Sequence, residues 1–546
     1  DAGDDRLLPL VLDAQHRLYL HRHWTQERRV ADALLVRAQA APGIATSESA
    51  THGMDSAVLR DALARLFPGR AANDRQQLAA ALALLRQLTV ISGGPGTGKT
   101  TTVARILALL VWCRPTGTPP PVIRLAAPTG KAAARLTQSI REAKQKLRDS
   151  VGAAAVVAEV VEAIPEEAAT LHRLLGARGG PGITRYAHHG GNPLALDVLV
   201  VDEASMLDLG LMAAVLDALP ATARLILLGD RDQLASVEAG NVLGDICNHG
   251  VTTGWRPALC AQLAALGLDP GIPAPESAPV MSDSLVVLAE SHRFRHDSGI
   301  GRAALAINAG SFDEPLFAAG DDGVCWQSPP VQALAGHIDT LVERHWQHWR
   351  QTEDPVEASR RFDTFRFLCA VREGEFGVGH INRLVEQSLM RRGLIDAGER
   401  HYSERHYSQM HYAGRPLLVT RNDYSVRLYN GDVGLVLPDA EAGGALRAFF
   451  VQPDGSVRRV ALNRLPAHET AYAMTVHKSQ GSEFGHIALV LPAQDAPVLT
   501  RELVYTGITR ARTGVTIWAP RDVLARAISR RVQRTSGLRD ALWPAQ

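Results

Sequence analysis

A glycine-rich segment between an apolar strand and a helix constrains this chain more than any other feature. The segment Gly93-Gly-Pro-Gly-Thr-Gly-Lys-Thr100 matches the pattern G-x-x-x-x-G-K-[ST]. It follows the apolar run 88–91 and precedes the helical run 100–112, which is the setting that such a loop requires. Its glycines let backbone N–H groups surround a phosphate at the start of a helix. The sequence therefore predicts a nucleotide-binding site within an α/β fold.

The last two residues of this loop carry its expected chemistry. Lys99 supplies a compact cation for the β- and γ-phosphate oxygens, and the Thr100 hydroxyl is an expected ligand of Mg²⁺. Lysine is rare in the chain, with five lysines among 58 basic residues, and we attribute the excess of arginine to coding bias. A planar guanidinium does not fit so tight a loop, so the retained lysine supports the phosphate-binding interpretation.

Two α/β units are predicted from apolar strand runs that alternate with helical patterns. The first unit contains four buried strands, at 88–91, 122–127, 198–201 and 225–228. The second begins near residue 286, with strands at 365–371, 487–491 and 515–518. Buried apolar strands with intervening helices are typical of doubly wound parallel sheets. A length of 546 residues is consistent with three or four domains.

The predicted domain organisation follows from these units and from the segments between them. Short strands separated by Asn-Gly, Gly-Gly and Asp-Gly turns indicate a small antiparallel barrel inserted into the second unit. We predict a helical N-terminal domain at 1–75, the first unit at 76–285 with a hairpin at about 176–196, the second unit at 286–412 and 470–546, and the inserted barrel at 413–469.

Two strand ends carry candidate catalytic groups. The run 198–201 ends in Asp202, which we expect to hold the Mg²⁺ shell, and in Glu203, which we expect to orient or deprotonate the attacking water. The run 225–228 is followed by Gln233, which is able to sense a γ-phosphate, although a glutamine at such a position is by itself more typical of a surface turn. An arginine reaching across a cleft stabilises the transferred phosphoryl group. Arg510 is the first candidate for this role and Arg293 the second.

Composition limits the class of protein. Apolar residues make up 46% of the chain and the formal net charge is +1, which argues against a disordered chain and against a basic protein that coats nucleic acid. Five cysteines without a C-x-x-C pair fit a reducing compartment and provide no zinc framework. A period of five places His401, His406 and His411 on no common face, so we predict a solvated loop there. The chain lacks a signal-peptide pattern and a long apolar run, and we predict a cytoplasmic protein.

Taken together, these segments resemble the motifs of superfamily 1 helicases, and most closely the 5′→3′ branch that contains the RecD family, the alpha subunits of bacterial exodeoxyribonuclease V. Leu125-Ala-Ala-Pro-Thr-Gly-Lys-Ala-Ala-Ala-Arg-Leu136 resembles motif Ia, and Met474-Thr-Val-His-Lys-Ser-Gln-Gly-Ser-Glu-Phe484 resembles motif V. Segments 91–102, 199–206, 229–240 and 504–512 resemble motifs I, II, III and VI. The resemblance runs from about Gln76 to the C-terminus. It implies two RecA-like parallel-sheet domains forming a P-loop helicase core, with a small 1B hairpin and an SH3-like insert.

The resemblance also implies roles for individual residues. Gln76 matches the adenine-reading glutamine, and the other nucleotide contacts would be Gly93, Gly94, Pro95, Gly96, Thr97, Gly98, Lys99, Thr100, Thr101, Gly481 and Glu483. DNA would be held by Pro128, Thr129, Lys131, Thr170, His172, His477 and Lys478, and from the insert by Arg421 and Asn422. For Arg421 and Asn422 a plain β-turn is an equally good interpretation.

As a member of this branch, the chain would be an ATP-dependent 5′→3′ DNA helicase or translocase that uses ATP and Mg²⁺. Its partners would be single-stranded and duplex-end DNA and the beta and gamma subunits of exodeoxyribonuclease V, which are RecB- and RecC-like, in a heterotrimer. The complex would act in double-strand break repair by homologous recombination and in DNA degradation.

Three alternatives differ from this function. A metal nuclease commonly needs E-x-K, and the one such tripeptide, Glu142-Ala-Lys144, lies in a charge-rich helical run where a solvated surface is the simpler interpretation. Nuclease activity is therefore expected in another subunit. A nucleotide-binding structural subunit without motor activity is disfavoured because the catalytic residues are intact. A stand-alone superfamily 1B helicase or a relaxase-type helicase would need no partner subunits.

Overall fold

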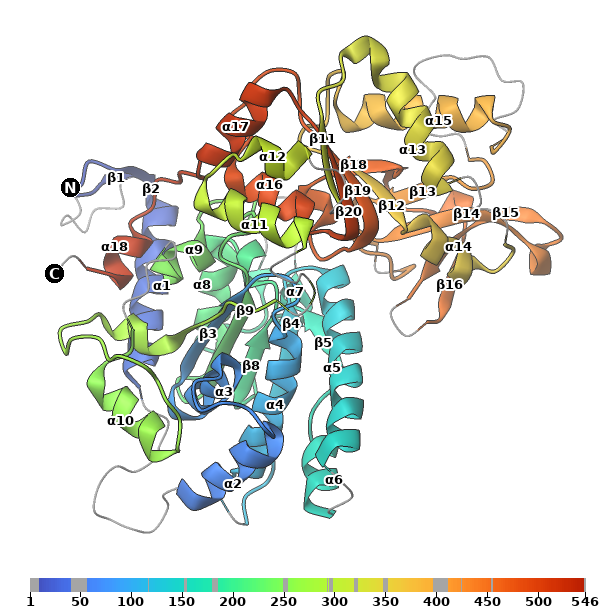
Figure 1. The fold of residues 1–546 in the computed structure, drawn as a ribbon. Helices are drawn as coiled ribbons and strands as arrows, with labels where there is room; N and C mark the ends of the chain where they lie inside the picture. The colour runs from blue at the N-terminus through green and yellow to red at the C-terminus, as the bar shows by residue number, and fades with distance from the viewer. Residues whose placement is uncertain are drawn as a thin grey trace.

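The computed structural model contains two α/β units, one above the other in Figure 1, and a smaller antiparallel sheet beside the upper unit. It describes residues 9–40, 56–115, 117–151, 155–178, 185–248, 254–291, 293, 298–318, 323–346, 352–395, 411–423, 425–452 and 455–544. His401 and His406 of the five-residue repeat lie outside this part of the chain.

The first sheet has six parallel strands in the order β10-β3-β9-β8-β4-β5. They are β3 (Leu88–Gly93), β4 (Ile123–Ala127), β5 (Ala168–Thr170), β8 (Val198–Val201), β9 (Arg224–Gly229) and β10 (Leu285–Leu288). All four strands predicted for this unit are present. β10 pairs with β3, so the boundary predicted between residues 285 and 286 is wrong, because it cuts through a strand of the first sheet.

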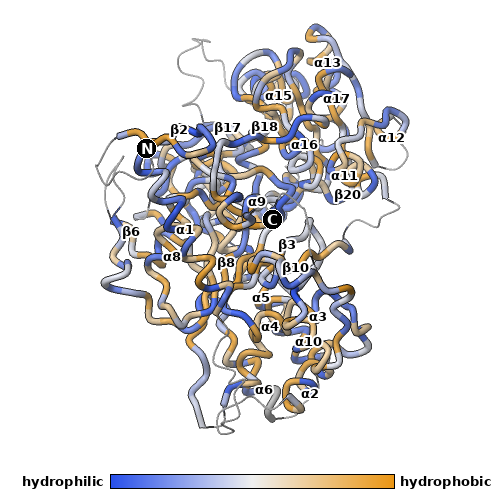
Figure 2. Tube along the Cα trace, turned by 90° about the vertical axis from the view of Figure 1, so that its left-hand side faces the viewer, coloured by the Kyte–Doolittle hydropathy of each residue, from blue (hydrophilic) through white to orange (hydrophobic). Residues whose placement is uncertain are grey.

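Successive residues of the first sheet face two different cores. In β8, Val198 and Val200 belong to one core, and Leu199 and Val201 belong to the other. The first core is covered by α2 (Ser56–Leu66), α3 (Arg75–Leu85), α4 (Lys99–Trp112), α5 (Gly130–Val151), α6 (Ala155–Glu162) and α10 (Pro257–Ala265). The second is covered by α1 (His21–Gln39), α8 (Leu209–Ala218), α9 (Val242–Ile246) and α18 (Leu538–Leu542). Figure 2 shows the apolar segments gathered around β8.

The described N-terminal helices are packed against the first sheet. Leu34 of α1 and Leu63 of α2 are buried in the second and first of these cores, respectively. A hairpin of β1 (Leu10–Leu12) and β2 (Leu18–Leu20) precedes α1 and leaves all four of its leucines exposed, namely Leu10, Leu12, Leu18 and Leu20.

The second sheet has five parallel strands in the order β11-β20-β19-β12-β18. They are β11 (Val324–Gln327), β12 (Phe365–Cys369), β18 (Ala473–Thr475), β19 (Phe484–Val490) and β20 (Ala511–Trp518). One face is covered by α11 (Gly299–Ala309), α16 (Arg501–Ile508) and α17 (Arg521–Ser529), and the other by α13 (Leu334–Trp346), α14 (Pro355–Phe362) and α15 (Val378–Arg391). The predicted α/β class, with two parallel sheets, is confirmed.

The inserted sheet is antiparallel, with the strand order β16-β15-β14-β13-β17. Its strands are β13 (Pro416–Val419), β14 (Val433–Asp439), β15 (Ala445–Val451), β16 (Val457–Ala461) and β17 (His468–Thr470). Leu417, Val436 and Phe450 form the centre of a core of its own. The SH3-like character of this insert stays a prediction.

A short hairpin and the C-terminal segment complete the description. The hairpin pairs β6 (Ala177–Arg178) with β7 (Arg185–Tyr186), within the region where a hairpin was predicted. After α17 the chain returns to the first unit, where α18 packs beside α1 and α9 (Figure 1). Within the described ranges, no helix combines the length and apolar character that a membrane crossing requires.

Candidate active site

The phosphate-binding loop joins β3 to α4 and depends on two glycines. Gly96 and Gly98 both have φ of +81°, a left-handed conformation that side chains disfavour, and Gly98 immediately precedes α4. A Cβ atom on Gly96 would lie 2.3 Å from the Cβ of Arg293, so this position is closed to a larger residue. The glycines of the motif are therefore required by backbone geometry and by the close approach of Arg293.

Lys99 and Gln76 both make hydrogen bonds within this loop. The Lys99 ammonium donates to the carbonyl oxygen of Gly94 at 3.1 Å and to that of Gly93. The buried Gln76 amide, on α3, donates to the carbonyl oxygen of Thr97 at 3.1 Å. Gln76 does not line the cavity described below, so its adenine-reading role stays a prediction.

Two carboxylates stand at the end of β8, as the sequence predicts. The Glu203 N–H donates to Asp202 Oδ1 at 2.8 Å, and burial, followed by the charge of Glu203, raises the pKa of Asp202 to about 6 although Lys99 lowers it. Glu203 has φ of +52° and ψ of 42°, a left-handed conformation that is rare for residues other than glycine. Backbone strain of this kind concentrates at functional sites.

Gln233 follows the end of β9 and is buried, so the alternative of a surface turn residue is wrong. Its amide nitrogen donates to Asp230 Oδ2 at 3.0 Å, and the Tyr505 hydroxyl donates to the same oxygen at 3.0 Å. Burial raises the pKa of Asp230. The buried Gln233 Oε1 has no hydrogen-bond partner among the described residues. An unsatisfied acceptor in the cavity wall is suited to a ligand or a bound water.

One cavity of about 330 Å³ brings together all six side chains predicted to be catalytic, which are Lys99, Asp202, Glu203, Gln233, Arg293 and Arg510. Pro95 to Thr101 and Glu483 also line it, whereas Gly481 lines a neighbouring cavity and Gly93 and Gly94 line neither of the two. The first sheet contributes the phosphate-binding loop and the carboxylates, and the second contributes Glu483 and Arg510 from the starts of β19 and β20. The cavity therefore lies between the two units.

The two candidate arginines are held by different contacts. Arg510 is buried, and its Nε donates to the carbonyl oxygen of Thr506 at 3.2 Å. Arg293 pairs with Glu483 at 2.8 Å. Burial and the nearby charges of Arg135, Arg512 and Arg510 lower the pKa of Arg293 to about 10. Such crowding of cations favours the binding of an anion.

Sequence reasoning missed three cavity residues on α5, namely Ala132, Arg135 and Ser139. The helix begins with the segment that resembles motif Ia, which was assigned to DNA contact alone. A usable signal was present, because Arg135 lies four residues after Lys131 and therefore near the same face of the helix.

Lys131 and Lys478, two of the predicted DNA contacts, face the inserted sheet. Lys131 lines a cavity of about 410 Å³ between α5 and the insert, together with Tyr429 and Asp432. Burial lowers the pKa of Lys131, while Asp432 acts in the opposite direction. The Lys478 ammonium donates to Asn430 Oδ1 at 2.7 Å. Tyr429 and Asp432 of the insert thus share a cavity with Lys131, and Asn430 of the insert binds Lys478.

The remaining predicted DNA contacts are distributed over several elements. Pro128 and Thr129 connect β4 to α5, and the Thr170 hydroxyl accepts from the Arg173 N–H at 3.2 Å and caps a short helix, α7 (Leu171–Leu174), that contains His172. Asn422 Oδ1 accepts from the Asn430 N–H at 2.8 Å, which favours a turn role for Asn422. His477 lines a groove of about 930 Å³ together with Arg501, Arg530, Arg531 and Arg534. Arg421 is exposed.

The E-x-K tripeptide on α5 does not have the solvated character expected of it. Glu142 is exposed, but Lys144 is 3% exposed and donates to the carbonyl oxygen of Ile164 at 2.8 Å. Lys144 also pairs with Glu166 at 3.0 Å. The lysine is thus committed to the packing of α5 against the segment before β5.

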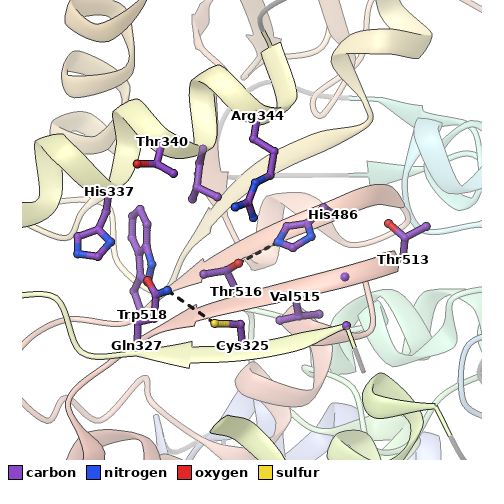
Figure 3. A pocket seen from close by; sticks show the side chains of 13 residues that line it. Cys325, Gln327, His337, Thr340, Arg344, His486, Thr513, Val515, Thr516 and Trp518 are labelled. Carbon is purple, nitrogen blue, oxygen red and sulfur yellow. Dashed lines mark hydrogen bonds between the residues drawn. The ribbon is translucent and has the colours of Figure 1, made fainter. Parts of the chain in front are cut away.

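A separate cavity of about 230 Å³ lies between α13 and strands β11, β19 and β20 (Figure 3). Cys325, His337, Arg344 and His486 line it, and the His486 ring contacts the Thr516 hydroxyl at 2.9 Å. None of the residues predicted from the sequence to be functional belongs to it.

The donor set of the main cavity suits Mg²⁺. Thr100 and Asp202 provide a hydroxyl and a carboxylate oxygen, and Mg²⁺ is commonly held by one or two such ligands together with phosphate oxygens. The raised pKa of Asp202 is consistent with a buried carboxylate that lacks a full counter-charge. The residues present therefore fit a magnesium nucleotide.

Contacts between the units connect the cavity to both sheets. The Leu234 N–H donates to Thr506 Oγ1 at 2.8 Å, and the Gln480 amide donates to the Leu234 carbonyl at 2.9 Å. Together with the bond from Tyr505 to Asp230, these contacts link the loop after β9 to α16 and to the segment before β19. A change at the cavity can therefore alter the contact between the units.

Two family models match parts of the chain. Residues 76–239 match the AAA domain family, and residues 470–518 match the UvrD-like helicase C-terminal domain family. A crystal structure of Pif1 helicase from Bacteroides is similar with a TM-score of 0.42 and 16% identity, over 85% of this chain and 95% of that one.

Curated relatives are much more similar. The RecBCD enzyme subunit RecD of Haemophilus influenzae is 37% identical over 95% of this chain and 79% of its own length. That of Mycolicibacterium smegmatis is 39% identical over 97% of this chain and 82% of its own length. The ATP-dependent RecD2 DNA helicase of Deinococcus radiodurans is 31% identical over 78% of this chain and 46% of its own length. This chain belongs to the RecD family.

Proposed function

We propose that the chain is an ATP-dependent DNA helicase with 5′→3′ polarity, and that it acts as the RecD subunit of a RecBCD-type heterotrimer in recombinational repair. The relatives named as RecBCD subunits support this assignment along almost the full length of the chain. We place the complex in the cytoplasm and its nuclease activity in another subunit. We also retain the division into an N-terminal domain, two RecA-like domains and an SH3-like insert, with the boundary between the two RecA-like domains moved beyond β10.

The observation that carries the proposal is the cavity shared by the two sheets. Lys99, Asp202 and Glu203 come from the first sheet, whereas Arg510 comes from the second. ATP bound here would touch both units at once. Hydrolysis would therefore change how the units contact each other, which is what a motor requires.

The residues of the cavity divide the work of hydrolysis. Lys99 binds the β- and γ-phosphate oxygens, and Arg510 and Arg293 stabilise the charge that develops as the γ-phosphoryl group is transferred. Glu203 orients the attacking water and accepts its proton. Mg²⁺, when bound by Thr100 and Asp202, neutralises phosphate charge. Gln233 is positioned to detect the γ-phosphate, since it lines the same wall and its amide contacts Asp230.

Movement along DNA follows if each unit binds the strand with a strength that depends on the nucleotide. The loop after β9 contacts α16 and Gln480, and Gln480 follows His477 and Lys478 by only a few residues. A nucleotide-dependent shift of this loop would reach both residues. Alternating binding and release by the two units would then carry the protein along single-stranded DNA.

The ATPase test compares wild type with Lys99→Gln. We expect single-stranded DNA to stimulate ATP hydrolysis by the wild type and the substitution to lower the rate by about 10²–10³-fold, because a phosphate-binding cation is lost. Lys146→Gln is the matched control, since Lys146 is an exposed lysine on α5. A wild type without DNA-stimulated ATPase activity would contradict the proposal.

Polarity and assembly need separate measurements. Unwinding of a duplex with a 5′ tail, and not of one with a 3′ tail, is expected. Gel filtration with RecB- and RecC-type subunits should give a ternary complex. Unwinding by the chain alone, with no complex formed, would favour the stand-alone helicase.

A further inference from the structure

Arg135 occupies a place that its motif does not explain. It lies on α5, one turn after Lys131, and it lines the nucleotide cavity rather than only the surface near the insert. Its guanidinium forms an ion pair with Glu483 and donates to the carbonyl oxygen of Gly481 at 3.5 Å. Both partners lie just before β19, so Arg135 reaches from the first unit to the second.

Glu483 is shared by three arginines from three different parts of the chain. Arg135 comes from α5, Arg293 from the segment after β10, and Arg512 from β20, with separations of 2.8 Å for Arg293 and 3.2 Å for Arg512. The Glu483 side chain is 7% exposed. The three arginines are more accessible, with exposed fractions of 37% for Arg135, 25% for Arg293 and 63% for Arg512. A single carboxylate balances the charge of only one of the three guanidinium groups.

More basic than acidic side chains line the nucleotide cavity. Arg135, Arg293 and Arg510 line it together with Lys99, and the acidic groups in its wall are Asp202, Glu203 and Glu483. Burial and neighbouring arginines lower the pKa of Arg135, while Glu203 and Asp202 act in the opposite direction. The charges of Glu203 and Asp202 therefore act on Arg135. These two carboxylates are the ones expected to lie beside the γ-phosphate of bound ATP.

We propose that Arg135 is a third arginine of the active site, which binds the γ-phosphate of ATP and is held by Glu483 when ATP is absent. A guanidinium binds phosphate oxygens in a bidentate manner, as it binds a carboxylate, so one partner can replace the other. Exchange from Glu483 to phosphate would release a contact between the two units. The inference rests on the proposed function, because it names a further residue of the same site.

The test compares binding of ADP with binding of a non-hydrolysable β,γ-imido analogue of ATP, both with Mg²⁺, to the full chain. Arg135→Gln should lower the affinity for the analogue by about tenfold or more and change the affinity for ADP by less than about twofold, because only the analogue carries a γ-phosphate. Arg135→Lys keeps the charge but not the bidentate geometry, so its affinity for the analogue should lie between those of Arg135→Gln and the wild type. Thermal melting of each variant verifies that it is folded.

Arg141→Gln is the matched control, because Arg141 is an exposed arginine of the same helix that pairs with Glu166 at 3.2 Å. It should bind both nucleotides as the wild type does. If Arg135→Gln loses affinity for ADP and for the analogue equally, or keeps its affinity for both, the inference is overturned. Those results can occur in a protein with DNA-stimulated ATPase activity, whereas absence of that activity in the wild type would instead refute the proposed function.

Discussion

At the residue scale, burial sets the chemistry of the cavity most clearly at Asp202. Removal from water and the charge of Glu203 raise the pKa of Asp202 to about 6, which lies above its usual value of 3.8. Between these two pH values the folded protein binds a proton that the unfolded chain has released. The free energy of unfolding therefore falls as pH rises from 3.8 to about 6. Above about pH 6 this group causes no further change in stability.

The same shift predicts how activity depends on pH. Because only the ionised carboxylate binds a divalent cation, kcat/KM for DNA-stimulated ATP hydrolysis should fall as pH decreases through about 6. The profile of kcat should decline at a lower pH, since bound Mg²⁺ favours the ionised form of Asp202. A kcat/KM that stays constant from about pH 7 to about pH 5 would contradict this assignment.

At the element scale, the loop after β9 is one of the contacts that join the two units. Its Leu234 N–H is bonded to the hydroxyl of Thr506, a residue of α16 that is 0% exposed. A buried N–H without a partner is costly, so this loop has one favourable position against α16. The loop, the helix and Gln480 therefore form one junction between the units.

Thr506→Val tests this junction, because valine has nearly the same shape but offers no acceptor. Urea unfolding should show a loss of about 1–3 kcal/mol in the free energy of unfolding, the cost of an unpaired buried N–H group. Thr340→Val on α13 is the control, since the exposed Thr340 hydroxyl donates to the Gly336 carbonyl of its own helix at 3.1 Å. It should change stability by less than about 0.5 kcal/mol. Equal effects of the two substitutions would contradict the importance of the junction.

At the scale of the whole molecule, the C-terminal segment joins the second unit to the far face of the first. Arg534 donates to the Gly240 carbonyl at 3.0 Å, and the Gly537 N–H donates to Glu27 Oε1 at 2.8 Å. The Trp543 indole then donates to the Asp245 carbonyl at 3.1 Å. Since Leu538, Leu542 and Trp543 also belong to a core of the first sheet, this segment fixes the two units relative to each other.

Trp543→Ala should weaken that connection. Loss of a large side chain from the core is expected to lower the free energy of unfolding by about 3 kcal/mol. Hydrogen exchange should increase in α1 and α9, which pack against α18. Trp24→Ala is the control, because Trp24 of α1 is only partly buried. Unchanged exchange in α1 and α9 of Trp543→Ala would contradict a structural role for this segment.

Much of the fold and of the cavity was predictable because the relevant signals are local. Buried strands appear as apolar runs, and the residues that follow them meet at one edge of a parallel sheet, so Lys99, Asp202 and Glu203 could be assigned together. The three-residue edge strand β5 was missed because so short a run gives no clear period. The edge strand β10 was missed because its residues were assigned to the start of the second unit.

What the sequence determined by itself is the chemistry of the nucleotide site, because a phosphate-binding loop needs glycines at set positions and hydrolysis needs particular side chains at strand ends. The tertiary structure alone decided the place of Arg135 beside Glu483, the burial of Lys144 and the return of Trp543 to the first unit. The pairs that Arg135 and Trp543 form join segments about 300 residues or more apart, and Lys144 is covered by a segment that follows its helix. No local pattern encodes such distances, which are set by how the sheets and helices pack.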